Sequence, residues 1–159
     1  MTQVKIIALG SVKEKYLTDA IAEYEKRLSS FCRVETAILR EVTIRNEDNE
    51  KEIAAALEKE GDEILSRIPE GAFVAALCIE GKEYSSTELS SLIGSAVDRG
   101  GKLCFLIGSS HGLCPRVKAR ADVRLSFSRM TFPHQLMRVL LLEGLYRSFS
   151  ILAGKRYHK

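Results

Sequence analysis

Leu103-Cys-Phe-Leu-Ile107 and the turn that follows it, Gly108-Ser-Ser-His-Gly112, decide the fold of this chain. Five consecutive apolar residues that end at a glycine are typical of a strand buried on both faces. The glycines allow a ligand to approach the backbone closely, although an ordinary strand-to-helix turn has the same composition. The turn matches neither a dinucleotide fingerprint nor a P-loop. We expect a buried strand whose carboxyl end borders a ligand.

Outward from this strand, apolar runs alternate with segments of helical periodicity. The pattern predicts strands at residues 4–9, 34–42, 73–79, 102–107 and 123–126. It predicts helices at residues 13–29, 52–66, 86–99, 115–121 and 133–153, and a turn at residues 80–83. This alternation indicates an α/β fold with a mainly parallel sheet flanked by helices. We expect a single domain over residues 1–159.

Three loops are expected to meet, because ligands of such sheets bind beyond the carboxyl ends of the strands. They begin at Ile79, Ile107 and Ser126. In the third loop, Phe127-Ser-Arg-Met-Thr-Phe132, the Phe and Met side chains suit a sandwich around a flat ring. The alternative is a packed loop with the Phe side chains in the core.

Charge is distributed unevenly along the chain. Residues 1–99 hold 13 Lys and Arg against 19 Asp and Glu, a balance of −6, and residues 100–159 hold 11 against 2, a balance of +9. The basic part suggests a polyanionic partner such as nucleic acid. The alternative is a dimer in which acidic and basic halves cover each other.

Composition points to a cytoplasmic protein. No apolar run approaches the roughly 18 residues of a membrane helix, and the start lacks the pattern of a signal peptide. The four cysteines have no CxxC spacing and are expected as buried thiols. His111, His134 and His158 lack metal-binding spacing, so we expect no metal site, and His134 is expected to pack or cap a helix.

The last predicted helix is apolar nearly all round, which suggests packing against both the sheet and a second subunit. Glu143 and Arg147 are four apart and are expected to pair. Arg138 has no acid at helical spacing and needs a phosphate, a carboxylate or a backbone carbonyl. The tail, residues 155–159, has the composition to hold phosphates and stack on a base, or to be a frayed terminus.

The chain resembles the RlmH family of SPOUT methyltransferases, which methylate pseudouridine in large-subunit ribosomal RNA. The resemblance covers the whole chain. The matching residues are Leu9-Gly10, Ala22-Glu-Tyr-Glu-Lys-Arg-Leu28, Ile107-Gly108, Gly112-Leu113, Leu125-Ser-Phe-Ser-Arg-Met-Thr-Phe-Pro-His-Gln135, Arg138, Glu143, Tyr146-Arg147 and Tyr157-His-Lys159.

The resemblance implies a SPOUT fold with a C-terminal trefoil knot, a homodimer and S-adenosylmethionine as cofactor. The implied reaction is methylation of N3 of a pseudouridine in 23S ribosomal RNA on the assembled ribosome. Cofactor contacts carry over to Leu77, Gly108, Phe127, Ser128, Arg129, Met130, Thr131 and Phe132. Catalysis and RNA holding are assigned to Arg138, Tyr157 and His158. The alternatives are methylation of another base or a ribose, and a non-enzymatic, ribosome-associated RNA-binding factor.

Overall fold

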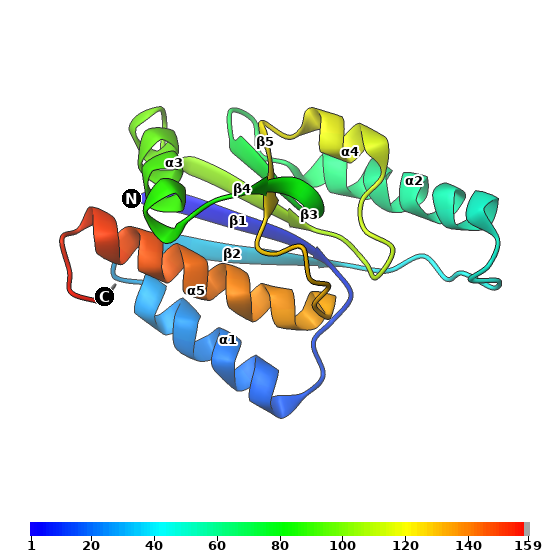
Figure 1. The fold of residues 1–159 in the computed structure, drawn as a ribbon, viewed down its shortest axis with the longest axis horizontal. Coiled ribbons are helices and arrows are strands. Elements are labelled where there is room, and N and C mark those ends of the chain that lie inside the picture. Colours follow the sequence, from blue (N-terminus) through cyan, green and yellow to red (C-terminus); the bar gives the residue numbers. More distant parts are fainter. Residues whose placement is uncertain (158–159) are drawn as a thin grey trace.

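One sheet organises the molecule, and all of its neighbouring strands are parallel, in the order β2-β1-β4-β3-β5 (Figure 1). The computed structural model describes residues 1–157. The strands are β1 (Thr2–Leu9), β2 (Cys32–Leu39), β3 (Phe73–Glu83), β4 (Lys102–Ile107) and β5 (Val123–Ser126). The predicted alternation of strands and helices is confirmed, and the apolar strand β4 lies at the centre of the sheet.

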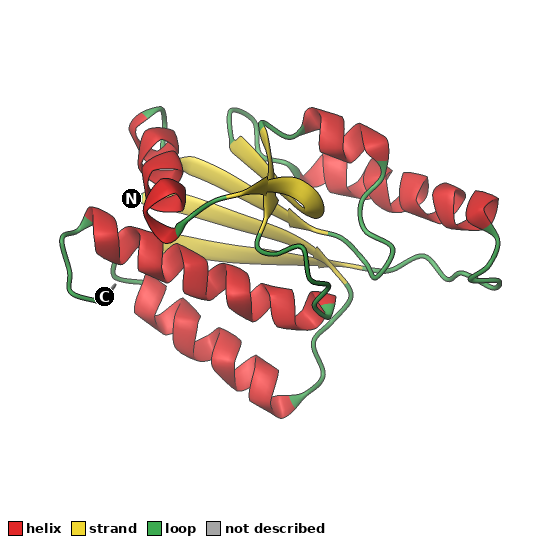
Figure 2. Ribbon diagram, viewed as in Figure 1, coloured by secondary structure: helices red, strands yellow, loops and turns green. Residues whose placement is uncertain are grey.

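Helices cover both faces of the sheet (Figure 2). They are α1 (Lys15–Leu28), α2 (Glu50–Arg67), α3 (Ser86–Asp98), α4 (Pro115–Arg120) and α5 (His134–Leu152). Helix α2 starts earlier than predicted, because the Asn49 side chain accepts hydrogen bonds from the amides of Lys51 and Glu52. Helix α3 starts at a capping box between Ser85 and Glu88.

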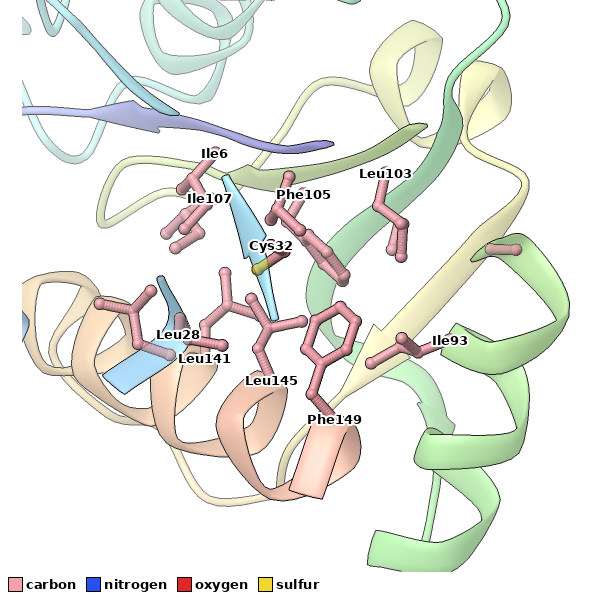
Figure 3. Packing of buried hydrophobic residues seen from close by; sticks show 14 of the residues in the cluster. Ile6, Leu28, Cys32, Ile93, Leu103, Phe105, Ile107, Leu141, Leu145 and Phe149 are labelled. Carbon is pink, nitrogen blue, oxygen red and sulfur yellow. The ribbon is translucent and has the colours of Figure 1, made fainter. Parts of the chain in front are cut away.

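The sheet has a hydrophobic core on each face. On one face, Leu141, Leu145 and Phe149 of α5 pack with residues of α1 and α3 against Phe105 and Ile107 (Figure 3). The opposite core joins residues of α2 and α4 to Ile7, Leu9 and Leu106. Burying each such side chain stabilises the fold by about 1.5–3 kcal/mol. The even distribution of apolar residues in β4 thus reflects burial on both faces.

Strand β3 departs from the prediction, because the expected turn at residues 80–83 is instead part of the strand. Leu77 and Lys82 both pair with Leu125, so the residues between them form a bulge. A glycine is needed in this bulge, since a Cβ on Gly81 would stand 2.7 Å from the backbone of Arg124. Gly81 therefore marks a close approach of two strands, not a chain reversal.

Acidic residues of the first half of the chain pair with basic residues of the second half. Arg116 bonds both Glu58 and Asp62 at 2.6 Å, and Lys118 pairs with Glu80. The two halves thus cover each other in part within a single chain. Such exposed pairs contribute little to stability, roughly 0–1 kcal/mol each.

The cysteines match the prediction, because all four are free thiols and three of them are buried. Burial raises the pKa of Cys32 to about 11, which keeps that thiol protonated at neutral pH. None of the helices described in residues 1–157 is long and apolar enough to cross a membrane.

Candidate functional site

A cavity of about 620 Å³ lies at the carboxyl ends of β3, β4 and β5. Its walls come from the β3 bulge, from the turn after β4 and from the loop between β5 and α5. The prediction that these three loops meet in one pocket is confirmed. A cavity of this size and mixed lining is typical of a small-molecule site.

Seven of the eight residues predicted to contact a cofactor line this cavity: Leu77, Gly108, Phe127, Ser128, Met130, Thr131 and Phe132. Arg129 does not line it. Its side chain is 90% exposed and reaches outward toward Glu83, with 3.8 Å between Nε and the carboxylate.

The turn after β4 is tight. Gly112 N–H donates to the Ser109 carbonyl over 2.9 Å, and these two residues form a short antiparallel bridge. A Cβ on Gly108 would stand 2.3 Å from the Gly112 carbonyl oxygen. Only glycine at position 108 therefore allows the turn to close against the cavity.

The loop after β5 is shaped by its serines. Ser126 Oγ donates to the Ser128 carbonyl over 3.0 Å, and Met130 N–H donates to Ser128 Oγ over 3.0 Å. These bonds hold the loop in a turn. Met130 is 71% exposed. Phe127 packs on the core and also lines the cavity.

One polar pair lies at the cavity wall, where Lys118 of α4 donates to Glu80 of the β3 bulge. This bond lowers the pKa of Glu80, so its carboxylate is ionised at neutral pH. Cys78 lies beside it, and burial raises the pKa of that thiol. This pair was not predictable from local patterns, because its members are 38 residues apart in the sequence.

Three acidic side chains, one from α2 and two from the segment before it, contact polar side chains that line the cavity. Glu60 accepts from Ser109 Oγ over 3.3 Å, and its other oxygen accepts from Val42 N–H over 2.9 Å. Glu47 bonds His111 at 2.5 Å, and Glu41 lies 3.3 Å from His134. The structure thus places His134 at the site, at the start of α5, whereas the sequence suggested packing or capping.

Glu60 is the least exposed of these acids, with 5% of its surface accessible. Burial raises the pKa of its carboxyl group, and the hydrogen bonds from Val42 and Ser109 oppose that rise. Sequence reasoning missed this residue because a glutamate in an amphipathic helix looks like a surface position.

Arg138 and Tyr157 do not line the cavity. Arg138 is 7% exposed, and its Nη1 donates to the Gly10 carbonyl over 3.4 Å, so a backbone carbonyl is its partner here. Burial lowers the pKa of its guanidinium group. His158 lies outside the described residues.

Tyr157 folds back onto α5. Its hydroxyl donates to Glu143 over 2.7 Å, its ring meets Tyr146 edge-on, and the Arg147 guanidinium lies over it at 4.7 Å. Arg147 also bonds Glu143 at 2.6 Å, which confirms the predicted pair. Burial and the bond to Glu143 raise the pKa of Tyr157, so the phenol stays neutral.

Comparison with known proteins gives consistent matches over nearly the full length. A family model described as "Predicted SPOUT methyltransferase" matches residues 2–158. The chain is 48% identical over 158 residues to ribosomal RNA large subunit methyltransferase H of Caldicellulosiruptor bescii, covering 98% of this chain and 99% of the relative. It is 46% identical over 157 residues to the protein of that name from Clostridioides difficile, with the same coverage.

A solved structure shows the same fold at low sequence similarity. It is a probable methylase family protein from Haemophilus influenzae, 10% identical, with a TM-score of 0.53 over 99% of this chain and 70% of that one. The family model matches residues 2–158, a range that contains all the residues that line the cavity. This chain therefore belongs to the SPOUT methyltransferase family, among the relatives named ribosomal RNA large subunit methyltransferase H.

Proposed function

We propose that this protein methylates N3 of a pseudouridine in 23S ribosomal RNA, on the assembled ribosome, with S-adenosylmethionine as the methyl donor. The observation that carries the proposal is the similarity to ribosomal RNA large subunit methyltransferase H proteins, at 46–48% identity over 99% of their length. That similarity does not itself include the methyl donor, the target atom, the dimer or the knot. These four parts of the proposal rest on the family resemblance and on the structural features described below.

The residues of the cavity fit the proposed donor. Leu77, Phe127 and Phe132 offer apolar surface for a flat ring, and the turn that begins at Gly108 brings backbone groups to the cavity. The ion pair of Glu80 and Lys118 supplies one charge of each sign at the cavity wall, which suits the zwitterionic amino-acid end of the molecule. When bound, S-adenosylmethionine supplies an electrophilic methyl group on its sulfonium.

The task of the protein is then to orient donor and acceptor in line and to exclude water. N3–H of the target base must lose its proton during the transfer, and we keep His158 as the candidate that accepts it. Arg138 and Tyr157 stay our candidates for holding RNA. Since neither lines the cavity of its own chain, their role requires a rearrangement or a second subunit.

A homodimer is part of the proposal. Leu136, Val139 and Leu140 on the first half of α5 are only half-buried and lie outside both hydrophobic cores. Met130 and Ile79 are exposed apolar residues that line the cavity. A second copy that covers this surface would close the cavity and shield these side chains from water.

We also propose the trefoil knot that the resemblance implies. It is supported by the close contact between α5 and the loop before it. A Cβ on Gly144 would stand 3.2 Å from the Phe127 ring, so the helix and the loop pack tightly at this point. Residues 1–159 form one catalytic domain in this proposal, and the protein works in the cytoplasm, where ribosomes are found.

The proposal is tested by mass spectrometry of ribosomal RNA from cells that lack the protein. We expect one methylated pseudouridine of the large subunit to lose its methyl group and to regain it when the gene is restored. Loss of methylation at another base or at a ribose would replace the target. Unchanged ribosomal RNA, together with no binding of S-adenosylmethionine, would favour a non-enzymatic RNA-binding factor.

A further inference from the structure

At the amino ends of the strands, part of one face of the sheet is exposed. In Figure 1, α2 and α4 lie toward the carboxyl ends of the strands, on the right, whereas the amino end of β1 lies on the left. The core under α2 and α4 takes in Ile7 and Leu9 of β1 but not its first residues. Gln3, Arg33 and Lys102, at the amino ends of their strands on this face, are exposed and lie in neither core.

A second cavity, of about 340 Å³, opens on this exposed part of the sheet face. Charged residues make up much of its lining. It includes Lys5, Arg33 and Lys102 with a single acid, Glu35. Lys5 Nζ bonds Glu35 at 2.9 Å, which leaves two positive charges in excess. The side chains of Arg33 and Lys102 make no hydrogen bond or ion pair to any residue in the described range 1–157.

Strand register fixes where these cations stand. Gln3 pairs with Arg33 on one side and with Lys102 on the other, so the three side chains form one row across β2, β1 and β4. Two strand spacings of roughly 4.8 Å place the Cα atoms of Arg33 and Lys102 about 10 Å apart, with the Gln3 side chain attached between them. Two free cations with a hydrogen-bonding group between them fit neighbouring phosphates of a nucleic acid strand.

The surroundings of this row add to the positive potential. Cys104 pairs with Lys5 in the sheet and is fully buried, and burial raises the pKa of its thiol to about 12. The positive charges of Lys5 and Arg120 oppose this rise in the pKa of Cys104. Arg120 therefore also contributes to the positive potential near the row. Other cations of the basic half, such as Arg116 and Lys118, already have acidic partners.

We propose that the exposed face around Arg33, Gln3 and Lys102 binds the phosphate backbone of the RNA substrate, as a contact separate from the methyl-donor cavity. The proposal rests on the proposed function, which makes RNA the substrate. From Lys102 to Gly108 the chain of β4 spans about 20 Å at roughly 3.3 Å per residue. A strand of nucleic acid covers that distance in about six nucleotides, at roughly 3.4 Å each along a duplex.

The test variant is the double substitution Arg33→Ala/Lys102→Ala. We expect the KM for ribosomes to rise about tenfold or more, while kcat and the affinity for S-adenosylmethionine stay unchanged. The slope of log affinity against log salt should become shallower by about two, one for each lost phosphate contact. The charge-preserving double variant Arg33→Lys/Lys102→Arg should keep the wild-type KM.

The control is Lys13→Ala/Lys51→Ala, which removes the same charge from exposed positions on α2 and before α1. The proposal is overturned if test and control give the same KM and salt slope. It is also overturned if the test variant binds protein-free ribosomal RNA as well as the wild type does, because the partner of the face is then a ribosomal protein. Wild-type protein that binds this RNA through the face but methylates no ribosomal RNA would sink the proposed function and leave the face standing.

Discussion

At the scale of single residues, Glu60 joins the cavity at the carboxyl ends of the strands to the rest of the fold. It is a buried carboxylate that accepts one hydrogen bond from Val42 and one from Ser109, and Ser109 lines the cavity. Removing an acceptor from a buried donor leaves that donor unsatisfied, which costs about 1–3 kcal/mol. Glu60 is thus a positioning residue for the turn after Gly108.

We predict that Glu60→Ala lowers the affinity for S-adenosylmethionine about tenfold, about 1.4 kcal/mol. Glu60→Gln should keep affinity near the wild-type value, because its carbonyl can accept from Val42 while its amide donates to the Ser109 hydroxyl. Isothermal titration calorimetry measures both variants. Equal binding by wild type and Glu60→Ala would show that the turn holds its shape without this contact.

The raised pKa of Glu60 gives the same residue a second readout. A carboxyl group whose pKa is higher in the folded chain stabilises the fold below its unfolded pKa, and that stability is lost as pH rises through the folded pKa. Glu60→Gln should therefore have a higher Tm than wild type at neutral pH. The difference should vanish in acid, where Glu60 is protonated. Thermal unfolding across this pH range checks the sign.

Gly108 supports a steric prediction. An alanine there would place its Cβ 2.3 Å from the Gly112 carbonyl, so the turn must open. We expect Gly108→Ala to weaken S-adenosylmethionine binding at least tenfold in the same titration. Ser91→Ala, at an exposed position of α3 that does not line the cavity, should bind normally. Normal binding by both variants would remove this turn from the donor site.

At the scale of elements, α5 and the segment after it form one unit. The Tyr157 hydroxyl bonds Glu143, and Arg147 holds the same carboxylate from one turn further along. Tyr24 of α1 borders this group, and its pKa is raised by burial and by Glu143. A tail of such composition would fray if it lacked these contacts. Up to Tyr157 the tail packs on α5 and is not frayed, while its binding of phosphates and a base stays a prediction.

We predict that deleting residues 157–159 leaves S-adenosylmethionine affinity within about threefold, roughly 0.7 kcal/mol, because Tyr157 does not line the cavity. Methyl transfer to ribosomes should fall at least tenfold, about 1.4 kcal/mol in the transition state. Single-turnover assays measure the transfer. Tyr157→Phe, which loses only the bond to Glu143, separates the ordering of the tail from the role of the ring. A truncated protein with wild-type transfer would show that RNA recognition lies elsewhere.

The elements themselves were largely predictable from the sequence. Apolar runs and helical periodicity depend on neighbours in the chain, and they gave all the strands and helices in their right order. The β3 bulge was missed because Gly81 is explained by Arg124, which is distant in sequence. The Glu60 contacts and the pair of Lys118 with Glu80 were missed for the same reason. Strand order was equally inaccessible, since β1 and β4 pair across most of the chain.

At the scale of the whole molecule, the half-exposed apolar side chains of α5 support the proposed homodimer. The first half of α5 carries Leu136, Val139 and Leu140 outside both cores, close in sequence to the cavity-lining Met137. The internal pairing of acidic and basic halves leaves these apolar residues, and not the charges, as the main reason to expect a dimer.

We predict a mass near twice 17.7 kDa by light scattering at micromolar concentration. Val139→Glu/Leu140→Glu should give a monomer, because it places two charges in the apolar contact. Tyr16→Glu on α1, whose side chain is 72% exposed, is the matched control and should stay dimeric. A monomeric wild type, or a dimeric double variant, would place the interface elsewhere or remove it.

The strand order also has a consequence for the order of events during translation. β1 is made first, but one of its two edges stays open until β4, which starts at Lys102, has been made. At about 5–20 residues per second, that interval lasts roughly 5–20 s. An open strand edge invites pairing with other chains, so a nascent chain that stalls in this interval is at risk of aggregation. The cavity takes residues up to Met137, so a nascent chain gains any stabilisation from the proposed methyl donor only after that residue has been made.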